Sequence, residues 1–243
     1  MDTAQICTAI KSFCDELAVR APEEIEPLLI GHKDRIRGRD LDQSPERFVS
    51  ENLVWPVLRA VDVDFITEAI LHGCNGRADF LIRNTSEQVL GECKPLNHYE
   101  KAVKDLREYL SHRTTEAEYG IATDGINWVF FREPDDRRRR VQMLEYHSFR
   151  HAMFNYWMNK GTVSPNLEGH YIHWKSSVCR KYGEPNSLRS IEVQQSAQIF
   201  ASKFRPQNLD KQLQPGSFDR TLDDFQGEQS KTQRENWGLS DFF

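Results

Sequence analysis

Apolar residues recur every three to four positions in five stretches of the chain, and this spacing predicts amphipathic helices. The expected helices span residues 3–20, 44–58, 98–112, 147–160 and 187–204. In the second helix, Ser44 suits the N-cap position and Pro45 suits the first turn. Pro56 lies inside the same apolar pattern, so this helix should kink or restart there.

Shorter apolar runs, several of them alternating with polar residues, predict β-strands. The expected strands span residues 64–72, 76–83, 89–95, 119–123, 127–132 and 139–146. The polar run 84–87 and the pair Asp124-Gly125 are turn sequences, which makes hairpins of the strands on either side of them. The resulting order of helices and hairpins predicts an α/β fold, in which helices flank a mixed sheet.

The composition divides the chain into four parts. These are an N-terminal helical extension (1–43), a sheet-bearing core (44–160), a mixed and helical extension packed on the core (161–204), and a tail (205–243). From Arg205 onward Gln, Asp, Ser, Pro and Gly dominate and apolar residues are scattered, so this tail is expected to be flexible and disordered.

Hydrophobic residues make up 38% of the 243 residues, which is enough for a sizeable core. The net charge is −5, so any contact with nucleic acid must come from local basic patches. The five cysteines are widely spaced and form no Cys-x-x-Cys pair, which disfavours a zinc site or a disulfide framework and predicts a cytoplasmic protein. No window approaches the roughly eighteen apolar residues of a membrane span, and no secretory signal is evident at the N-terminus.

The hairpin formed by residues 76–83 and 89–95 concentrates the candidate chemistry. Glu92 and Lys94 are two positions apart, so their side chains share one face of the second strand. Asp79 on the neighbouring strand can reach the same face. Two carboxylates beside a lysine suit a hard divalent cation and an activated water molecule. An ion pair on a half-exposed strand is the alternative, but this strand looks central, where charges without a task are costly.

These residues resemble the PD-(D/E)xK nuclease superfamily. The segments 76–80 (Gly-Arg-Ala-Asp-Phe) and 91–94 (Gly-Glu-Cys-Lys) look most like the nuclease domain at the N-terminus of type I restriction enzyme R subunits. Two further landmarks are similar, namely Trp-Pro-Val-Leu at 55–58 and Thr-Asp-Gly-x-x-Trp at 123–128. The resemblance covers roughly residues 44–146 and implies a restriction-endonuclease-like sheet.

The resemblance implies that Asp79, Glu92 and the backbone carbonyl of Cys93 hold Mg²⁺ or Mn²⁺. It also implies a further catalytic and metal-binding acid on the preceding helix. Glu51 is preferred for this acid because it lies nearer the apolar stripe, with Glu46 as its competitor. Lys94 would orient or deprotonate the attacking water and balance charge on the scissile phosphate. The implied products carry a 5′-phosphate and a 3′-hydroxyl.

The expected DNA contacts are Arg77 in the hairpin, Lys101 on the following helix, and the run Arg137, Arg138, Arg139 and Arg140. A solvated hairpin tip is the simpler explanation for that run. The following helix resembles a Gln-Leu-Arg-x-Tyr pattern of the family, but Asp105 stands where glutamine is usual. The substitution leaves the helix intact and the polar role of this position open.

The chain ends in Asn-Trp-Gly-Leu-Ser-Asp-Phe-Phe. The positions of Asn236, Leu239, Phe242 and Phe243 resemble a sliding-clamp-binding box, in which the leucine and the paired aromatic residues fill a clamp pocket. Asn236 replaces the usual glutamine. A tail that folds back on its own domain is the alternative.

Two functions from different classes follow. The first is a metal-dependent endonuclease that hydrolyses DNA, either restriction-like or repair-like. The alternative is a catalytically weak nuclease-fold module that binds DNA or a replication partner such as a sliding clamp. The sequence leaves the oligomeric state open, a homodimer included.

Overall fold

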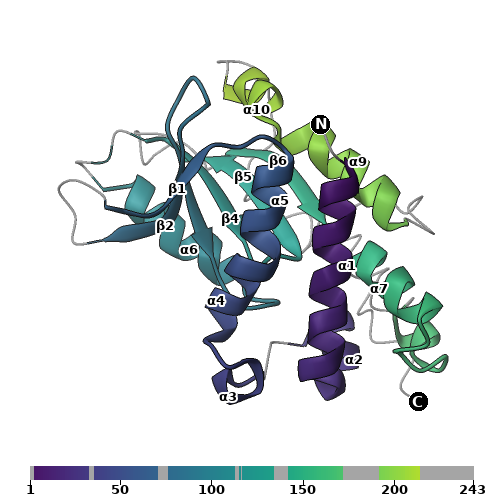
Figure 1. Cartoon of the computed structure of the whole chain (residues 1–243). Helices are drawn as coiled ribbons and strands as arrows, with labels where there is room; N and C mark the ends of the chain where they lie inside the picture. Colours follow the sequence, from purple (N-terminus) through teal and green to yellow (C-terminus); the bar gives the residue numbers. More distant parts are fainter. Residues whose placement is uncertain are drawn as a thin grey trace, which may run out of the picture.

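The computed structural model describes residues 3–32, 36–70, 76–112, 115, 117–133, 142–171 and 192–213. Within these residues a six-stranded mixed sheet carries helices on both faces, as Figure 1 shows. The predicted α/β architecture is therefore confirmed. None of the helices in the described ranges is long and apolar enough to cross a membrane.

The strands lie in the sheet in the same order as in the sequence. They are β1 (Phe65–Ile70), β2 (Arg77–Ile82), β3 (Val89–Cys93), β4 (Tyr119–Thr123), β5 (Asn127–Arg132) and β6 (Gln142–Ser148). All neighbours are antiparallel except β3 and β4, which run parallel. Helix α6 (Tyr99–Leu110) makes the crossover that a parallel pair requires.

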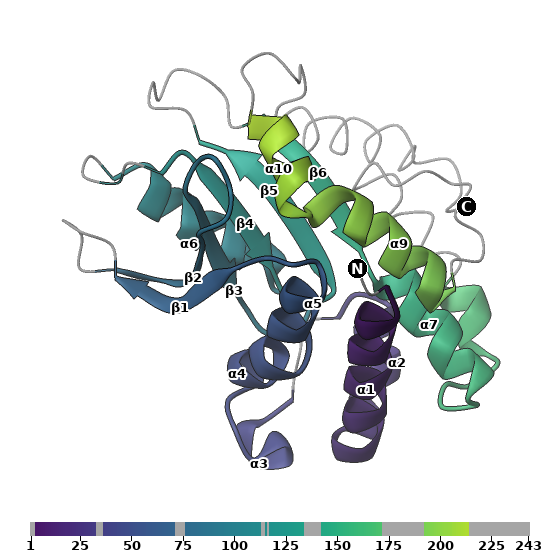
Figure 2. The ribbon, with the colours of Figure 1, turned by 45° about the horizontal axis from the view of Figure 1, so that its top comes forward.

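The other helices gather on the face of the sheet opposite α6, and Figure 2 shows α9 lying beside α1 and α7. They are α1 (Thr3–Arg20), α2 (Ile25–Leu29), α3 (Gly38–Leu41), α4 (Pro45–Val49), α5 (Trp55–Ala60), α7 (Arg150–Asn159), α9 (Val193–Phe204) and α10 (Pro206–Leu213). A short 3₁₀ turn, η1 (Pro22–Glu24), joins α1 to α2.

Alternation along the strands divides the core into two layers. Phe80, Ile121 and Trp128 point into the larger layer, which helices α1, α5, α7 and α9 cover. Leu90 and Phe131 point the other way, into a smaller layer covered by α6. The extensions that contribute α1 and α9 therefore share one hydrophobic cluster with the sheet.

Two glycines allow the sheet to be packed this closely. A Cβ on Gly91 would lie 2.0 Å from the ring of Phe80, its cross-strand partner on β2. A Cβ on Gly120 would lie 2.6 Å from the side chain of Leu106 on α6. Both contacts are far shorter than van der Waals distance, so a side chain at either position would displace its neighbour.

The predicted break near Pro56 takes the form of a π-helical turn. Helix α4 begins where Ser44 accepts the N–H of Arg47 at 3.2 Å, and it continues through η2 (Ser50–Val54) into α5. The N–H of Trp55 donates to the carbonyl of Ser50, five residues earlier. Proline has no N–H, and the helix restarts with Pro56 in the first turn of α5.

The predicted start of the flexible tail at Arg205 is wrong. Residues from Pro206 to Leu213 form helix α10, because Leu209 and Leu213 find apolar partners in the larger layer. Tyr119 donates its hydroxyl to the carbonyl of Leu213 at 3.1 Å, and this bond also ties the helix to the sheet. Residues 214–243 lie outside the described residues.

Candidate active site

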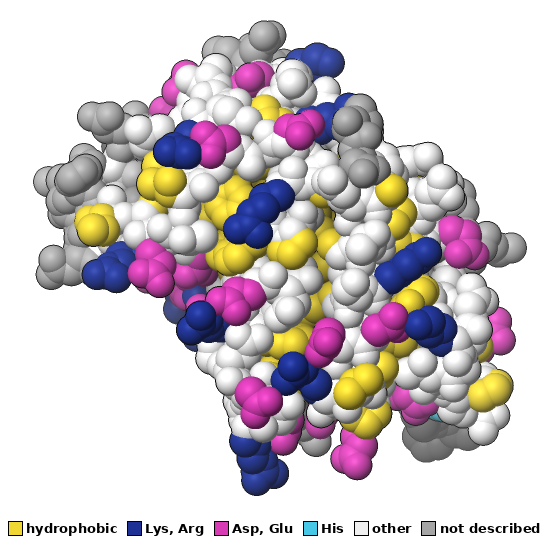
Figure 3. All heavy atoms as spheres, viewed as in Figure 1, with side chains coloured by type: hydrophobic (Ala, Val, Ile, Leu, Met, Phe, Trp, Pro, Cys, Tyr) yellow, Lys and Arg dark blue, Asp and Glu magenta, His cyan; other side chains and the backbone are white. Residues whose placement is uncertain are grey.

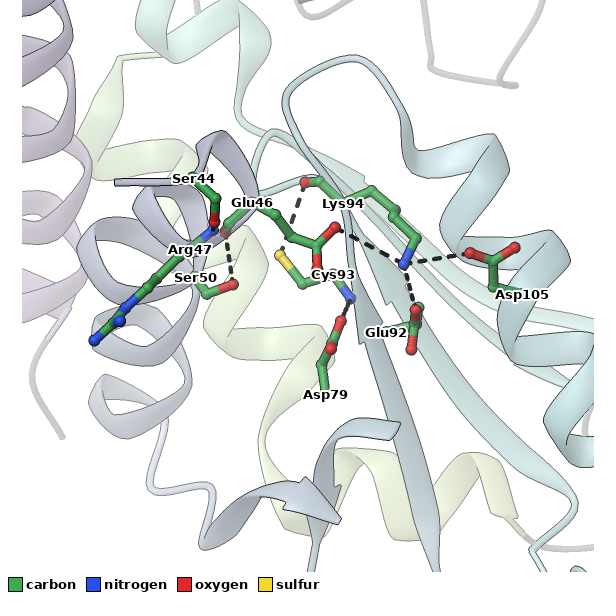
Figure 4. A network of polar contacts seen from close by, with 9 residues as sticks. All are labelled: Ser44, Glu46, Arg47, Ser50, Asp79, Glu92, Cys93, Lys94 and Asp105. Carbon is green, nitrogen blue, oxygen red and sulfur yellow. Dashed lines mark hydrogen bonds and ion pairs between the residues drawn. The ribbon is translucent and has the colours of Figure 1, made fainter. Parts of the chain in front are cut away.

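The predicted site residues meet at one end of the sheet, between helices α4 and α6. Figure 4 shows Asp79 on β2, Glu92 and Lys94 at the end of β3, Glu46 on α4 and Asp105 on α6. The expected juxtaposition of Glu92 and Lys94 with Asp79 on the neighbouring strand is observed. The two helices add carboxylates from opposite sides of the sheet.

Asp79 lies where the β2–β3 ladder ends. The last paired residues are Phe80 and Gly91, and beyond them the carboxylate of Asp79 accepts the Cys93 N–H at 2.7 Å. A side chain thus replaces a backbone acceptor at the point where the strands separate. The N–H and C=O of a strand residue point to the same side, so the Cys93 carbonyl also lies on the edge that faces β2.

Lys94 is held by three carboxylates. Its ammonium nitrogen bonds Glu92 Oε1 at short range, lies 3.3 Å from Asp105 Oδ2, and lies 3.9 Å from Glu46 Oε2. The Lys94 side chain is only 9% exposed. A buried cation of this kind is stable only because the surrounding charges compensate for its lost hydration.

Glu92 is buried and only half satisfied. Its Oε1 accepts from Lys94, but its Oε2 is buried without a hydrogen-bond partner. Burial and the nearby charge of Asp79 raise the pKa of Glu92 to about 7, although Lys94 works against this shift. Burial likewise raises the pKa of Asp79. A buried carboxylate oxygen without a partner is costly, so this oxygen is a candidate ligand atom.

The charge of Lys94 is set by the same neighbours. Burial alone would lower its pKa, but the hydrogen bond to Glu92 and the charges of Glu92 and Glu46 outweigh burial and raise the pKa. Lys94 therefore stays protonated in this arrangement. An ammonium can orient water and neutralise phosphate charge, but it cannot accept a proton.

The structure does not bring Glu51, the preferred helical acid, together with Asp79, Glu92 and Lys94. Glu51 accepts from Arg47 Nε at 2.7 Å on the exposed side of the helix. Glu46 faces Lys94, and burial raises its pKa. Ser50, one turn after Glu46, is buried, and its hydroxyl donates to the backbone carbonyl of Glu46 at 2.8 Å. The apolar stripe marks the face of this helix that packs against the core. The site lies elsewhere, beyond the end of the sheet, so nearness to the stripe does not identify the acid that faces the site.

Helix α6 presents Lys101, Asp105 and Tyr109 toward the site at four-residue spacing, and Asp105 is a site residue that sequence reasoning left open. Lys101 is exposed, and its charge lowers the pKa of Glu46. Tyr109 is half-buried, and burial together with the charge of Glu92 raises its pKa. The Gln-Leu-Arg-x-Tyr resemblance was the available signal, because it marks two of these three positions, Asp105 and Tyr109.

A further acid, Glu68, was missed entirely. Thr67 pairs with Phe80 and Ala69 with Ala78, so Glu68 stands opposite Asp79 on the edge strand. Its φ of 52° is unusual for a residue with a side chain, and no sequence pattern predicts it. Its charge contributes to the raised pKa of Asp79.

Arg77, a predicted DNA contact, lies 3.6 Å from Glu68 and is exposed. On the face drawn in Figure 3, basic and acidic side chains of the described residues are interspersed rather than gathered into a basic stripe. The other predicted contacts, Arg137–Arg140, and the tail residues Asn236, Leu239, Phe242 and Phe243 lie outside the described residues.

The site was tested for its fit to a divalent cation. No group of three or more His, Cys, Asp or Glu side chains in the described ranges is arranged to hold a metal. Magnesium, however, is often held by only one or two carboxylates together with water and substrate oxygens. Asp79, the unpartnered Oε2 of Glu92 and the edge-facing Cys93 carbonyl supply an all-oxygen set of this smaller kind. These residues therefore fit Mg²⁺ or Mn²⁺.

Comparison with protein-family models, curated proteins and solved structures gave no match.

Proposed function

We propose that this chain is a metal-dependent endonuclease that hydrolyses DNA phosphodiester bonds. The observation that carries the proposal is the buried, unpartnered Oε2 of Glu92, a carboxylate whose other oxygen bonds the protonated Lys94 and whose pKa the charge of Asp79 helps to raise. An oxygen left unsatisfied beside a second carboxylate and a fixed ammonium favours a site that is completed by a cation and an anionic substrate.

In this proposal Asp79, Glu92 and the Cys93 carbonyl hold the divalent cation, and Glu46 lies at the edge of the same site. The cation would lower the pKa of a bound water and stabilise charge on the phosphate. Lys94 orients the attacking water and offsets the negative charge that grows on the phosphoryl oxygens. Water oxygen bonds to phosphorus as the bond to the 3′ oxygen breaks. The attacking water gives a proton to the solvent and the 3′ oxygen takes one from the solvent, which leaves a 5′-phosphate and a 3′-hydroxyl.

DNA would approach from the open side of the site, where Lys101 and Arg77 are exposed on two different elements. Lys101 lowers the pKa of Glu46 and Arg77 lies 3.6 Å from Glu68, so both charges are close to acids of the site and would meet the neighbouring phosphates. Such contacts hold the backbone without reading its sequence. This proposal therefore predicts binding that weakens steeply with salt.

The proposal is tested by incubating the protein with supercoiled plasmid, linear duplex, single-stranded and branched DNA in Mg²⁺ or Mn²⁺. Cleavage that chelation abolishes is expected for the wild type. Asp79→Ala and Lys94→Ala should lower it at least about 100-fold, because each removes part of the charge stabilisation. Thermal melts should show that both variants are folded.

Absence of cleavage by the wild type on every DNA form and with both metals would sink the proposal. DNA retention in a gel under the same conditions would then favour the catalytically weak binding module. A clamp partner and a cytoplasmic location remain proposals from the sequence. For the clamp, deletion of Leu239–Phe243 should abolish binding, and unchanged binding would contradict that prediction.

A further inference from the structure

The Lys94 ammonium has three carboxylates within 3.9 Å, and two of them approach it most closely. Glu92 bonds it from the buried side, and Asp105 Oδ2 approaches to 3.3 Å from helix α6. Asp105 is 28% exposed on its side chain, so it lies at the mouth of the site. Figure 4 shows the two acids on different sides of the ammonium group.

The two contacts differ in what a bound metal would do to them. Glu92 offers its oxygens to the cation, and the cation competes with Lys94 for the same carboxylate. Asp105 lies on another element, α6, which Ala102, Leu106 and Leu110 hold against the sheet, with Leu90 of β3 in the same cluster. The lysine side chain is a flexible four-carbon stem. Without a second carboxylate to hold it, the ammonium would leave its position in the site when Glu92 binds the metal.

We propose that Asp105 is a positioning residue that keeps the Lys94 ammonium at the mouth of the site when Glu92 turns to the metal. The inference rests on the proposed nuclease function. An ammonium has three donors, so one bond to Asp105 leaves the others for water and phosphate. A neutral glutamine could also accept such a bond, but a carboxylate adds the attraction of an ion pair to it.

The same charge has a cost for substrate binding. Asp105 adds a negative charge at the entrance of a site that must admit a phosphate, and it therefore repels DNA. Asp105 thus stabilises the complex in which the phosphate reacts, but it weakens the initial binding of DNA. Its removal should lower both kcat and KM, whereas a partly unfolded preparation loses kcat without a fall in KM.

The test compares Asp105→Asn, Asp105→Glu and the control Glu108→Gln, which removes one charge from an exposed position of the same helix. Asp105→Asn is expected to lower kcat about 10-fold or more and to lower KM for DNA several-fold. Asp105→Glu should recover part of kcat, and Glu108→Gln should match the wild type. An unchanged kcat in Asp105→Asn would overturn the inference. So would a rise in KM that accompanies a fall in the thermal stability of this variant.

A second measurement does not depend on activity. The ¹⁵N signal of the Lys94 ammonium is followed by NMR as Mg²⁺ is added. In the wild type the signal should persist, because Asp105 slows exchange of the ammonium protons with water. In Asp105→Asn it should disappear on Mg²⁺ addition. A signal that is lost in both proteins, or unaffected in both, would contradict the positioning role.

If the wild type cleaves no DNA, the nuclease proposal fails and this measurement alone decides whether Asp105 anchors Lys94.

Discussion

Glu46 and Glu51 lie five residues apart on one helix, and only Glu46 faces the Lys94 ammonium. Glu46→Gln is expected to lower metal-dependent cleavage about 10-fold or more, because it removes a carboxylate from the edge of the site. Glu51→Gln should retain cleavage within about twofold, because an exposed ion pair of this kind contributes less than about 1 kcal/mol. Parallel kinetics of the two variants check this, and equal losses would contradict the assignment.

Glu92 should make the stability of the metal-free protein depend on pH. Its pKa is 4.5 in an ordinary setting and about 7 in the folded protein. The folded state therefore binds more protons between these values, and the unfolding free energy should fall as pH rises through this window. The loss attributable to Glu92 is at most about 3 kcal/mol.

Denaturant titrations in EDTA from pH 4.5 to pH 8 measure this dependence. Asp79 and Glu46 also have raised pKa values, so the wild type is compared with Glu92→Gln, which cannot ionise at that position. The stability of the variant should fall less with pH. Curves that run parallel for the two proteins would show that Glu92 ionises normally.

The close packing of strand β3 against Phe80 requires a glycine at position 91. Gly91→Ala places a methyl group against the buried ring of Phe80, which cannot move without disturbing Trp55 and Phe65. We expect the variant to lose about 1–3 kcal/mol of unfolding free energy. Gly169→Ala is the matched control, because its added methyl group meets no neighbouring atom. Similar melting of both variants would show that the strand relaxes freely.

Most elements were predictable from local patterns, because alternation, helical spacing and turn residues are local properties. Strands β4 and β5 occupy their predicted ranges, and the hairpin residues Asp79, Glu92 and Lys94 meet as expected. The face that Glu46 presents and the approach of Asp105 depend on how two separate helices pack at the end of the sheet. That arrangement is tertiary, and no spacing within either helix specifies it.

The C-terminal boundary of the folded part was also unpredictable from composition. Helix α10 is largely polar, and mean composition hides its two buried leucines, Leu209 and Leu213. Their partners come from the distant larger layer of the core. A polar segment with two correctly spaced apolar residues can therefore belong to the fold.

At the scale of the whole molecule, truncation measures what helix α10 contributes to the fold. A chain that ends after Leu213 retains α10 and serves as the reference. Ending it after Phe204 removes α10 and should lower the unfolding free energy by about 2–5 kcal/mol. Calorimetry of the two truncated chains checks this, and equal melting temperatures would contradict a structural role for α10.

The carboxylate that replaces a backbone acceptor at the end of β2 and β3 has one more consequence. The Cys93 amide proton is protected by Asp79 and not by a ladder partner, so its exchange with solvent depends on a group that is expected to bind metal. When a cation draws electron density from that carboxylate, the hydrogen bond from the Cys93 amide to Asp79 should weaken. The exchange rate of this amide proton with solvent should then rise. Neighbouring amides within the ladder should be unaffected. This single proton would then report the occupancy of the site in a protein that has never been given DNA.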